Sequence, residues 1–272
     1  MKRIGLLGCG AIGTEIALAI DSGRIKASLT HVFDSSTDSS SRLVSMLSSK
    51  PEVVGNAGLL AASPVDIVVE AASQDAVRDN ALSILQNRKD LMIMSAGALL
   101  DESIFDIILE GCRDFGRHVY LPTGAIAGLD AIRAVQGELE SVVLVTTKSP
   151  RSLKGAKFFK TSKVDPDNIL EKTVLYEGLA DEAVRLFPSN VNVAALLSLA
   201  GMGSQKTRVK IVADPATDKN THEIEAYGKF GRISIKVENV PSPTNPRTSR
   251  LATLSAIECL GRVCGREISV GT

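Results

Sequence analysis

The stretch RIGLLGCGAIG, residues 3–13, decides the fold of the N-terminal half of the chain. An apolar run suited to a buried strand leads directly into Gly8, Gly10 and Gly13, which have the spacing G-x-G-x-x-G. The first glycine permits a tight turn, the second lets the backbone approach a pyrophosphate, and the third lets the next helix pack closely on the strand. Helical spacing follows, so the motif predicts a strand–helix–strand unit that binds a dinucleotide.

Asp34 ends the second predicted strand, about 20 residues after the glycine motif. A carboxylate at this place accepts hydrogen bonds from the ribose diol of NAD and repels the 2′-phosphate of NADP. The serines that follow and Arg42 leave NADP open as a second cofactor. The helix N-terminus, with roughly half a positive charge, would face the phosphates, and we expect Ala11 and Ile12 to contact the cofactor there.

The rest of the first half repeats the alternation of strand and helix. Further strand-like runs are separated by helical patterns, which predicts a parallel sheet of Rossmann type covered on both faces. These runs are 27–34, 66–73, 90–97 and 117–124. Small residues in EAAS (70–73) and SAGAL (95–99) stand at the ends of two of them, where such sheets bind ligands.

After about residue 138 the apolar residues alternate with period two, as in SVVLVTTKS, TRVKIVAD, HEIEAYGKF and RISIKVEN. This pattern predicts a second α+β domain built on a mainly antiparallel sheet. We therefore expect a dinucleotide-binding domain over residues 1–124, completed by a C-terminal helix over 248–272. Residues 125–247 would form a domain for substrate binding, catalysis and oligomerisation.

Composition narrows the class of protein. The 272 residues include 31 basic and 31 acidic side chains, a formal net charge of +0, which predicts no surface for nucleic acid. No apolar run reaches the ~18 residues of a membrane span. The four cysteines lack metal-ligand spacing, so we predict no metal site and reduced thiols in a cytoplasmic protein. They are Cys9, Cys112, Cys259 and Cys264.

One of the three histidines stands in NTHEIEAYGKF, residues 220–230. Strand alternation places His222 on an apolar face with Ile224, and it directs Glu223 and Glu225 to the opposite face. A histidine on an apolar face is either a packed core residue or a proton carrier, since its ordinary pKa near 6.5 suits acid–base catalysis. The residues themselves leave both possibilities open.

Further candidates follow from polar residues in apolar surroundings. Asn190, before a predicted helix, is either its cap or a substrate ligand. Asn192 stands among apolar residues and needs a polar partner, which a nicotinamide carboxamide or a substrate could provide. An anionic substrate would need positive charge, for which Lys148, Arg151 and Arg247 are candidates, each otherwise a solvated surface charge.

Five segments spread in order over essentially the whole chain resemble the L-aspartate dehydrogenase family. They are GCGAIG, LPTGAIAGLDAI, FPSNVNVAALLSLAG, DPATDKNTHEIEAYGKFG and PSPTNPRTSRLATLSAI. By position, the resemblance implies that His222 is the active-site histidine and that Asn192 and Ala125 contact the cofactor, with Ala127 in the same loop as the alternative alanine. GAIAG replaces the usual GAIGG of the family, and the added methyl group could tighten the pocket.

The resemblance implies NAD(P)-dependent oxidation of L-aspartate to iminoaspartate, which hydrolyses to oxaloacetate and ammonia and feeds quinolinate and NAD synthesis. Asn190, Lys148 and Arg247 would bind the substrate carboxylates, and the antiparallel sheet would pair two subunits in a homodimer. Two other functions stay open. One is a related two-domain dehydrogenase of another amino acid or an aldehyde, and the other is a non-catalytic NAD-binding sensor.

Overall fold

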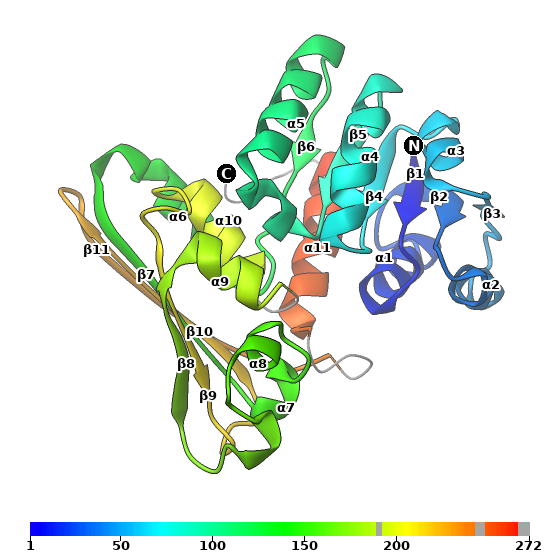
Figure 1. Cartoon of the computed structure of the whole chain (residues 1–272). Helices are drawn as coiled ribbons and strands as arrows, with labels where there is room; N and C mark the ends of the chain where they lie inside the picture. Colours follow the sequence, from blue (N-terminus) through cyan, green and yellow to red (C-terminus); the bar gives the residue numbers. More distant parts are fainter. Residues whose placement is uncertain (189–191, 243–247, 266–272) are drawn as a thin grey trace. The chain divides into compact units, whose positions relative to one another are not determined.

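The computed structural model describes residues 1–188, 192–242 and 248–265. The chain divides into two compact units. The first comprises residues 1–122 and the C-terminal segment from Thr253, and the second comprises residues 123–252. Figure 1 shows the elements of both units in chain order.

The first unit is built on a six-stranded sheet whose order is β3-β2-β1-β4-β5-β6, with every pair parallel. This order reverses direction between β1 and β4, which is the switch point at which such sheets bind dinucleotides. The predicted parallel sheet is thus confirmed. The strands are β1 (Lys2–Leu7), β2 (Ala27–Phe33), β3 (Glu52–Val53), β4 (Ile67–Glu70), β5 (Asp90–Ile93) and β6 (Val119–Tyr120).

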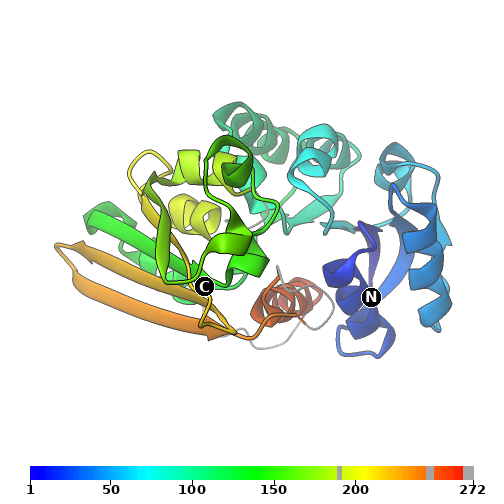
Figure 2. The ribbon, with the colours of Figure 1, turned by 60° about the horizontal axis from the view of Figure 1, so that its bottom comes forward.

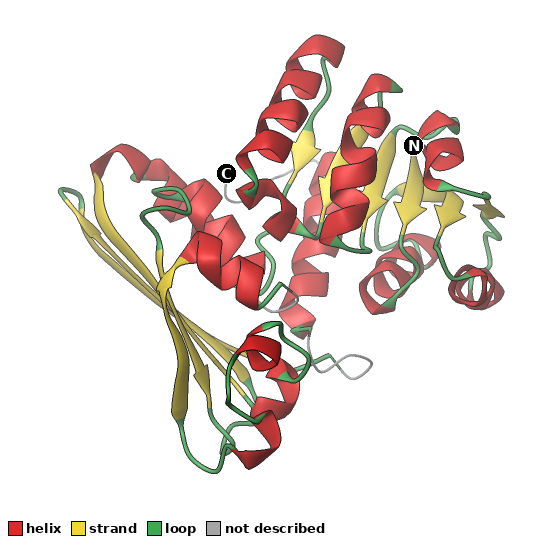
Figure 3. Ribbon diagram, in the orientation of Figure 1, coloured by secondary structure: helices red, strands yellow, loops and turns green. Residues whose placement is uncertain are grey.

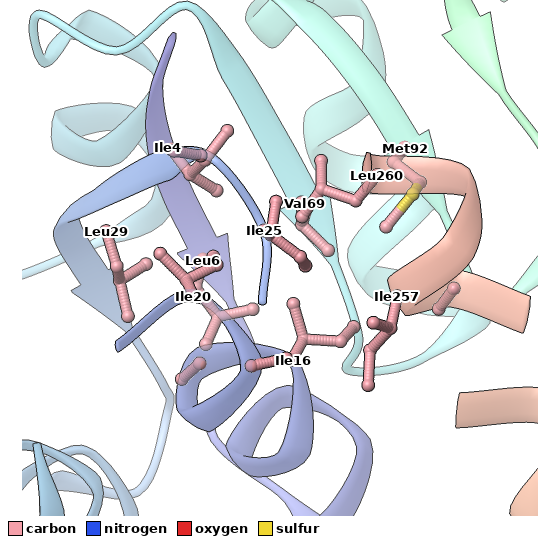
Figure 4. Packing of buried hydrophobic residues seen from close by; sticks show 14 of the residues in the cluster. Ile4, Leu6, Ile16, Ile20, Ile25, Leu29, Val69, Met92, Ile257 and Leu260 are labelled. Carbon is pink, nitrogen blue, oxygen red and sulfur yellow. The ribbon is translucent and has the colours of Figure 1, made fainter. Parts of the chain in front are cut away.

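Helices cover both faces of this sheet (Figure 3). Side chains of α1, α2 and α11 form one buried cluster with those of the strands, as Ile16, Leu6 and Ile257 illustrate in Figure 4. On the other face Gly5 approaches Leu60 of α3. The helices are α1 (Ala11–Asp21), α2 (Thr37–Met46), α3 (Ala57–Ala62), α4 (Gln74–Gln86), the 3-10 turn η1 (Ala96–Leu100), α5 (Glu102–Phe115) and α11 (Arg250–Val263).

The second unit is built on a five-stranded sheet of order β11-β10-β7-β9-β8. All neighbouring pairs are antiparallel except β7 and β9, which run parallel. The mainly antiparallel sheet predicted from period-two alternation is confirmed, with this one parallel pair added. The strands are β7 (Leu139–Lys148), β8 (Thr173–Leu179), β9 (Arg208–Ala213), β10 (Asn220–Gly228) and β11 (Gly231–Asn239).

Helices α6, α9 and α10 lie over one face of the second sheet, as Figures 1 and 2 show from two directions. The burial of β10 alternates along the strand, and its inward positions from Asn220 to Gly228 are all buried. The helical elements of this unit are α6 (Leu129–Ala134), η2 (Gln136–Glu138), α7 (Pro150–Leu153), α8 (Phe158–Thr161), η3 (Pro166–Asn168), α9 (Ala180–Leu186) and α10 (Asn192–Ala200).

Candidate active site

The glycine motif forms a loop between β1 and α1, and the space around the Cα atom differs among its three glycines. Gly8 has a φ of +101°, and a Cβ there would lie 2.7 Å from the carbonyl group of Ala71. A Cβ on Gly13 would overlap the carbonyl oxygen of Gly8. Nothing lies within 4 Å of a Cβ built on Gly10. The loop is therefore closed on its inner side and open at Gly10, where the motif predicts a pyrophosphate.

The N-terminus of α1 provides hydrogen-bond donors beside that opening. Its cap residue is Gly10, which has no side chain to accept hydrogen bonds from the first helical N–H groups. By contrast, α2, α3, α4 and α5 each begin with a side chain that accepts such a bond. Ala11 and Ile12 are the first two residues of α1. Uncapped backbone donors and the helix dipole suit a phosphate group, so the residues fit the predicted cofactor.

Asp34 directly follows β2 and accepts two backbone hydrogen bonds. One oxygen accepts from the N–H of Cys9 at 2.7 Å, and the other accepts from the N–H of Ser36 at 2.8 Å. Asp34 thereby ties the end of β2 to the glycine loop. A carboxylate has about four lone-pair sites, so it retains acceptor capacity for a ribose diol. Burial and the nearby Asp34 raise the pKa of the Cys9 thiol to about 12, which makes Cys9 an inert thiol.

Glu70 is a functional candidate of this region that lies outside the glycine motif. It ends β4, is 1% exposed, and accepts hydrogen bonds from the backbone N–H groups of Ala72, Met94 and Ser95 and from the Ser95 hydroxyl. Burial raises the pKa of this carboxyl, against the lowering by those hydrogen bonds. Through these hydrogen bonds Glu70 links the segment EAAS, at the end of β4, to the segment SAGAL, at the end of the neighbouring strand β5. The signal in the sequence was a carboxylate within an apolar run.

His222 lies on the inner face of β10, at the end of the second sheet where polar residues gather. Its side chain is 1% exposed, and its Nδ1 shares a hydrogen bond of 3.0 Å with the hydroxyl of Thr146, its partner across the strands β10 and β7. Burial and then the charge of Lys148 lower the pKa of His222 to about 3. The imidazole is thus neutral at physiological pH, and its Nε2 is the nitrogen that Thr146 does not engage.

Lys148 ends β7 on the same face as Thr146, two residues further along. It is 4% exposed, and burial lowers the pKa of its ammonium group to about 8. The sequence left Lys148 open as a solvated surface charge, and the structure shows that it is buried. A buried ammonium beside a neutral imidazole can bind an anionic group.

The loop that contains Ala125 is held against the same sheet. Ala125 is buried, and its carbonyl oxygen accepts a hydrogen bond of 2.9 Å from Nδ2 of Asn239, the last residue of β11. Gly128, with a φ of +72°, lies so close to Ile235 of β11 that a Cβ would overlap that side chain. Asn239 also pairs with Asn220 across the ladder from β10 to β11. The loop is therefore positioned at the sheet end that carries His222.

Of the remaining predicted site residues, two lie within the described part of the chain and two lie outside it. Asn192 is the first residue of α10 and is partly buried, and Arg151 is an exposed residue of α7. Asn190 and Arg247 lie outside the described residues. The structure groups Gly8, Gly10, Ala11, Ile12, Gly13 and Asp34 in the first unit. It groups Lys148 and His222, with the loop of Ala125, in the second.

Comparison with known proteins shows to which family this chain belongs. A family model described as the C-terminal part of aspartate dehydrogenase matches residues 130–263, and one described as the NAD-binding domain of homoserine dehydrogenase matches residues 8–122. The chain is 63% identical over 272 residues to an L-aspartate dehydrogenase of Nitrosopumilus maritimus, with 100% of both chains covered. The chain belongs to the L-aspartate dehydrogenase family.

Two further relatives support the membership of this family. An L-aspartate dehydrogenase of Methanococcoides burtonii is 46% identical, with 100% of both chains covered. The crystal structure of aspartate dehydrogenase from Thermotoga maritima superposes with a TM-score of 0.75 at 28% identity, again with 100% of both chains covered. The chain is thus an oxidoreductase of the dehydrogenase type, with a nicotinamide dinucleotide as its cofactor. Among the described residues, no helix is both long and apolar enough to span a membrane.

Proposed function

We propose that this chain oxidises L-aspartate to iminoaspartate, which hydrolyses to oxaloacetate and ammonia. The observation that carries the proposal is the neutral imidazole of His222, oriented by Thr146 at 3.0 Å and placed near the buried Lys148, in a chain 63% identical to an L-aspartate dehydrogenase. The substrate is an amine with two carboxylates. The reaction therefore needs a base and positive charge, and this sheet face provides both.

We assign His222 the role of the base. For Nε2 to accept a proton, Nδ1 must carry the hydrogen and donate it to the Thr146 hydroxyl, which fixes the tautomer. The proton comes from the substrate ammonium or from the water that attacks iminoaspartate, and both steps suit a neutral imidazole. A pKa of about 3 makes the resting imidazole a weak base. Since the charge of Lys148 contributes to that low pKa, a substrate carboxylate next to Lys148 would raise it toward neutrality.

We assign one substrate carboxylate to Lys148. Its burial supports this role, because a desolvated ammonium gains more from a carboxylate than an exposed one does. Asn190 and Arg247 stay predictions as further carboxylate ligands. Asn192 and Ala125 stay predictions as cofactor contacts, and the hydrogen bond from Asn239 to the Ala125 carbonyl supports a fixed position for that loop.

The cofactor assigned to the first unit is NAD, with NADP as a second possibility. Bound at the glycine loop, either nicotinamide dinucleotide supplies the hydride acceptor of the oxidation. Asp34 supports NAD, because its carboxylate lies at the end of β2 with acceptor capacity for a ribose diol. The net reaction consumes L-aspartate, water and the oxidised cofactor. It yields oxaloacetate, an ammonium ion, the reduced cofactor and a proton.

Initial rates test the proposal directly. The change in nicotinamide absorbance is measured with L-aspartate and each of NAD and NADP, and in reverse with oxaloacetate, ammonium and each reduced cofactor. We expect turnover with L-aspartate, a higher kcat/KM with NAD than with NADP, and little turnover with L-homoserine or L-malate. A preference for L-homoserine over L-aspartate would contradict the substrate, and a preference for NADP would contradict the role of Asp34.

The biological setting and the assembly stay proposals of the same kind. Delivery of iminoaspartate to quinolinate and NAD synthesis is expected from the reaction product. We also propose a homodimer that pairs through the second sheet. The outer face of β10 and β11 supports this, since it is regular and carries cross-strand ion pairs such as Arg232 with Glu225 at 2.9 Å. Light scattering in solution measures the subunit count.

A further inference from the structure

Asn220 carries a buried acceptor that the fold does not satisfy. The residue begins β10 and is 1% exposed. Its Nδ2 donates a hydrogen bond of 3.3 Å to the Ser249 hydroxyl. Among the residues that the structure describes, none donates a hydrogen bond to its Oδ1. More than about 90% of buried polar groups have a partner, so this exception calls for an explanation.

Rotating the side-chain amide would not remove the exception. As the side chain is placed, the amide nitrogen pairs with Ser249 and the acceptor Oδ1 is left unpaired, whereas a rotated amide would leave its N–H donors unpaired and would suit a substrate carboxylate, the case that a raised inhibition constant of succinate in the Asn220 variants would reveal. Two other buried side-chain atoms of the described residues also lack a partner, namely Arg117 Nε and Ser198 Oγ. They stand before β6 and on α10, whereas Asn220 stands on the strand of His222.

The position of Asn220 points to the ligand. Asn220 and His222 are two residues apart on the same buried face of β10, so their Cα atoms are separated by ~6.7 Å along the strand. β10 begins at Asn220 and the antiparallel β7 ends at Lys148, so both residues lie at the same end of this strand pair. A carboxamide oxygen, an imidazole and an ammonium therefore share one buried end of the sheet.

The three groups differ in what they can bind. Lys148 offers donors and positive charge, which suit a carboxylate, whereas an oxygen acceptor would repel one. The substrate ammonium is the complementary group for Asn220, since it offers three donors and its charge strengthens each hydrogen bond. Asn220 and His222 are neighbours on one buried face of β10, so an amine bound by Asn220 would lie on the side of the strand that carries the imidazole.

We propose that Asn220 Oδ1 accepts a hydrogen bond from the α-ammonium group of the substrate, and that Asn220 thereby selects amino acids over carboxylic acids without an amine. This inference rests on the proposed oxidation of L-aspartate and adds the residue that recognises the amine. Binding of the amine by Asn220 also holds its nitrogen within reach of His222. The orphaned oxygen of the free protein is thus satisfied by the substrate.

The test separates recognition of the amine from recognition of the carboxylates. Asn220→Leu keeps the approximate side-chain size and removes the acceptor, and Asn220→Ala serves as a second variant with less steric demand. For each variant we would measure the KM for L-aspartate, the inhibition constant of succinate, and the dissociation constant of NADH by fluorescence. Succinate is a dicarboxylate of the same length without an amine. Thr221→Val is the matched control, since Thr221 is the next residue of β10 and lies on the outer face.

We expect the KM for L-aspartate to rise roughly tenfold or more in both Asn220 variants, because hydrogen bonds to charged groups are among the strong ones. The inhibition constant of succinate and the NADH dissociation constant should change less than about threefold, as should every constant of Thr221→Val. A KM within about twofold of wild type would overturn the inference. So would a parallel rise for succinate, or a loss confined to NADH. Wild-type protein without activity on L-aspartate would instead overturn the proposed function, and this inference with it.

Discussion

Lys148 is a buried charge whose presence should lower the stability of the fold. Burial lowers the pKa of its ammonium group from 10.5 to about 8, which corresponds to about 3 kcal/mol between the two protonation states. Because the unfolded chain holds the proton more tightly, this penalty is fully present below pH ~8. It disappears as the pH rises from the folded pKa toward the unfolded value.

We predict that Lys148→Met stabilises the protein by roughly 1–3 kcal/mol at pH 7, since an apolar side chain removes the penalty for burying the charge. Urea unfolding at pH 7 and at pH 10 measures the effect, and the advantage of the variant should shrink at pH 10. The same variant should show a raised KM for L-aspartate. A variant less stable than wild type at pH 7 would show that the interactions of Lys148 outweigh its desolvation.

For single residues, the sequence predicts the face of the strand on which a side chain lies, but not its hydrogen-bond partners. Alternation in NTHEIEAYG was enough to place His222 on the inner face of β10, because strand side chains alternate without exception along a regular strand. The hydrogen bond to Thr146 depends on the register between β10 and β7, and no local pattern encodes that register. The role of Glu70 is hidden for a similar reason, since two of its partners, Met94 and Ser95, follow the neighbouring strand β5 and lie far from it in the chain.

At the scale of elements, the turn from β1 into α1 depends on the close approach of Gly13 to the carbonyl oxygen of Gly8. A Cβ at this position would overlap that oxygen, so the loop must shift to accept it. We predict that Gly13→Ala weakens NADH binding by roughly tenfold or more and lowers stability by about 1–3 kcal/mol. Fluorescence titration and thermal unfolding measure the two effects.

The control for that variant is Gly55→Ala in the same unit. A Cβ on Gly55 would make only an ordinary contact of 3.7 Å with Leu59, so NADH binding should stay within about twofold of wild type. Equal losses of NADH affinity in both variants would show that the effect is not specific to the glycine loop.

Helices and strands with a regular spacing of apolar residues could be predicted from the sequence. Where that spacing is interrupted, the bounds or the presence of the element could not. Helical spacing runs through DEAVRLFPSNVNVAALLSLAG with a helix start predicted after Asn190, and the structure has two helices there, of which α9 ends at Leu186 and α10 begins at Asn192. Pro188 between them explains the break, because proline cannot donate the backbone bond that a continuous helix needs. Strand β8 was missed, since Val174 and Leu175 stand next to each other and interrupt its alternation.

At the scale of the whole molecule, the sequence indicated two kinds of sheet but not all the pairings within them. Alternation of strand and helix implies parallel crossovers, which is why the parallel sheet could be predicted from five of its six strands, all except the two-residue β3. Period-two strands imply one covered face, yet they do not say which strands are neighbours. The parallel pair of β7 and β9 shows this, because β8, α9 and α10 all intervene in the chain.

The most direct test of the account is the turnover of His222→Asn with L-aspartate and NAD. We predict that kcat falls at least about 100-fold, which is the lower range for loss of a general base, while the melting temperature and NADH affinity stay close to those of wild type. A kcat within a few-fold of wild type, in a folded variant that still binds NADH, would contradict the role of His222 as the base.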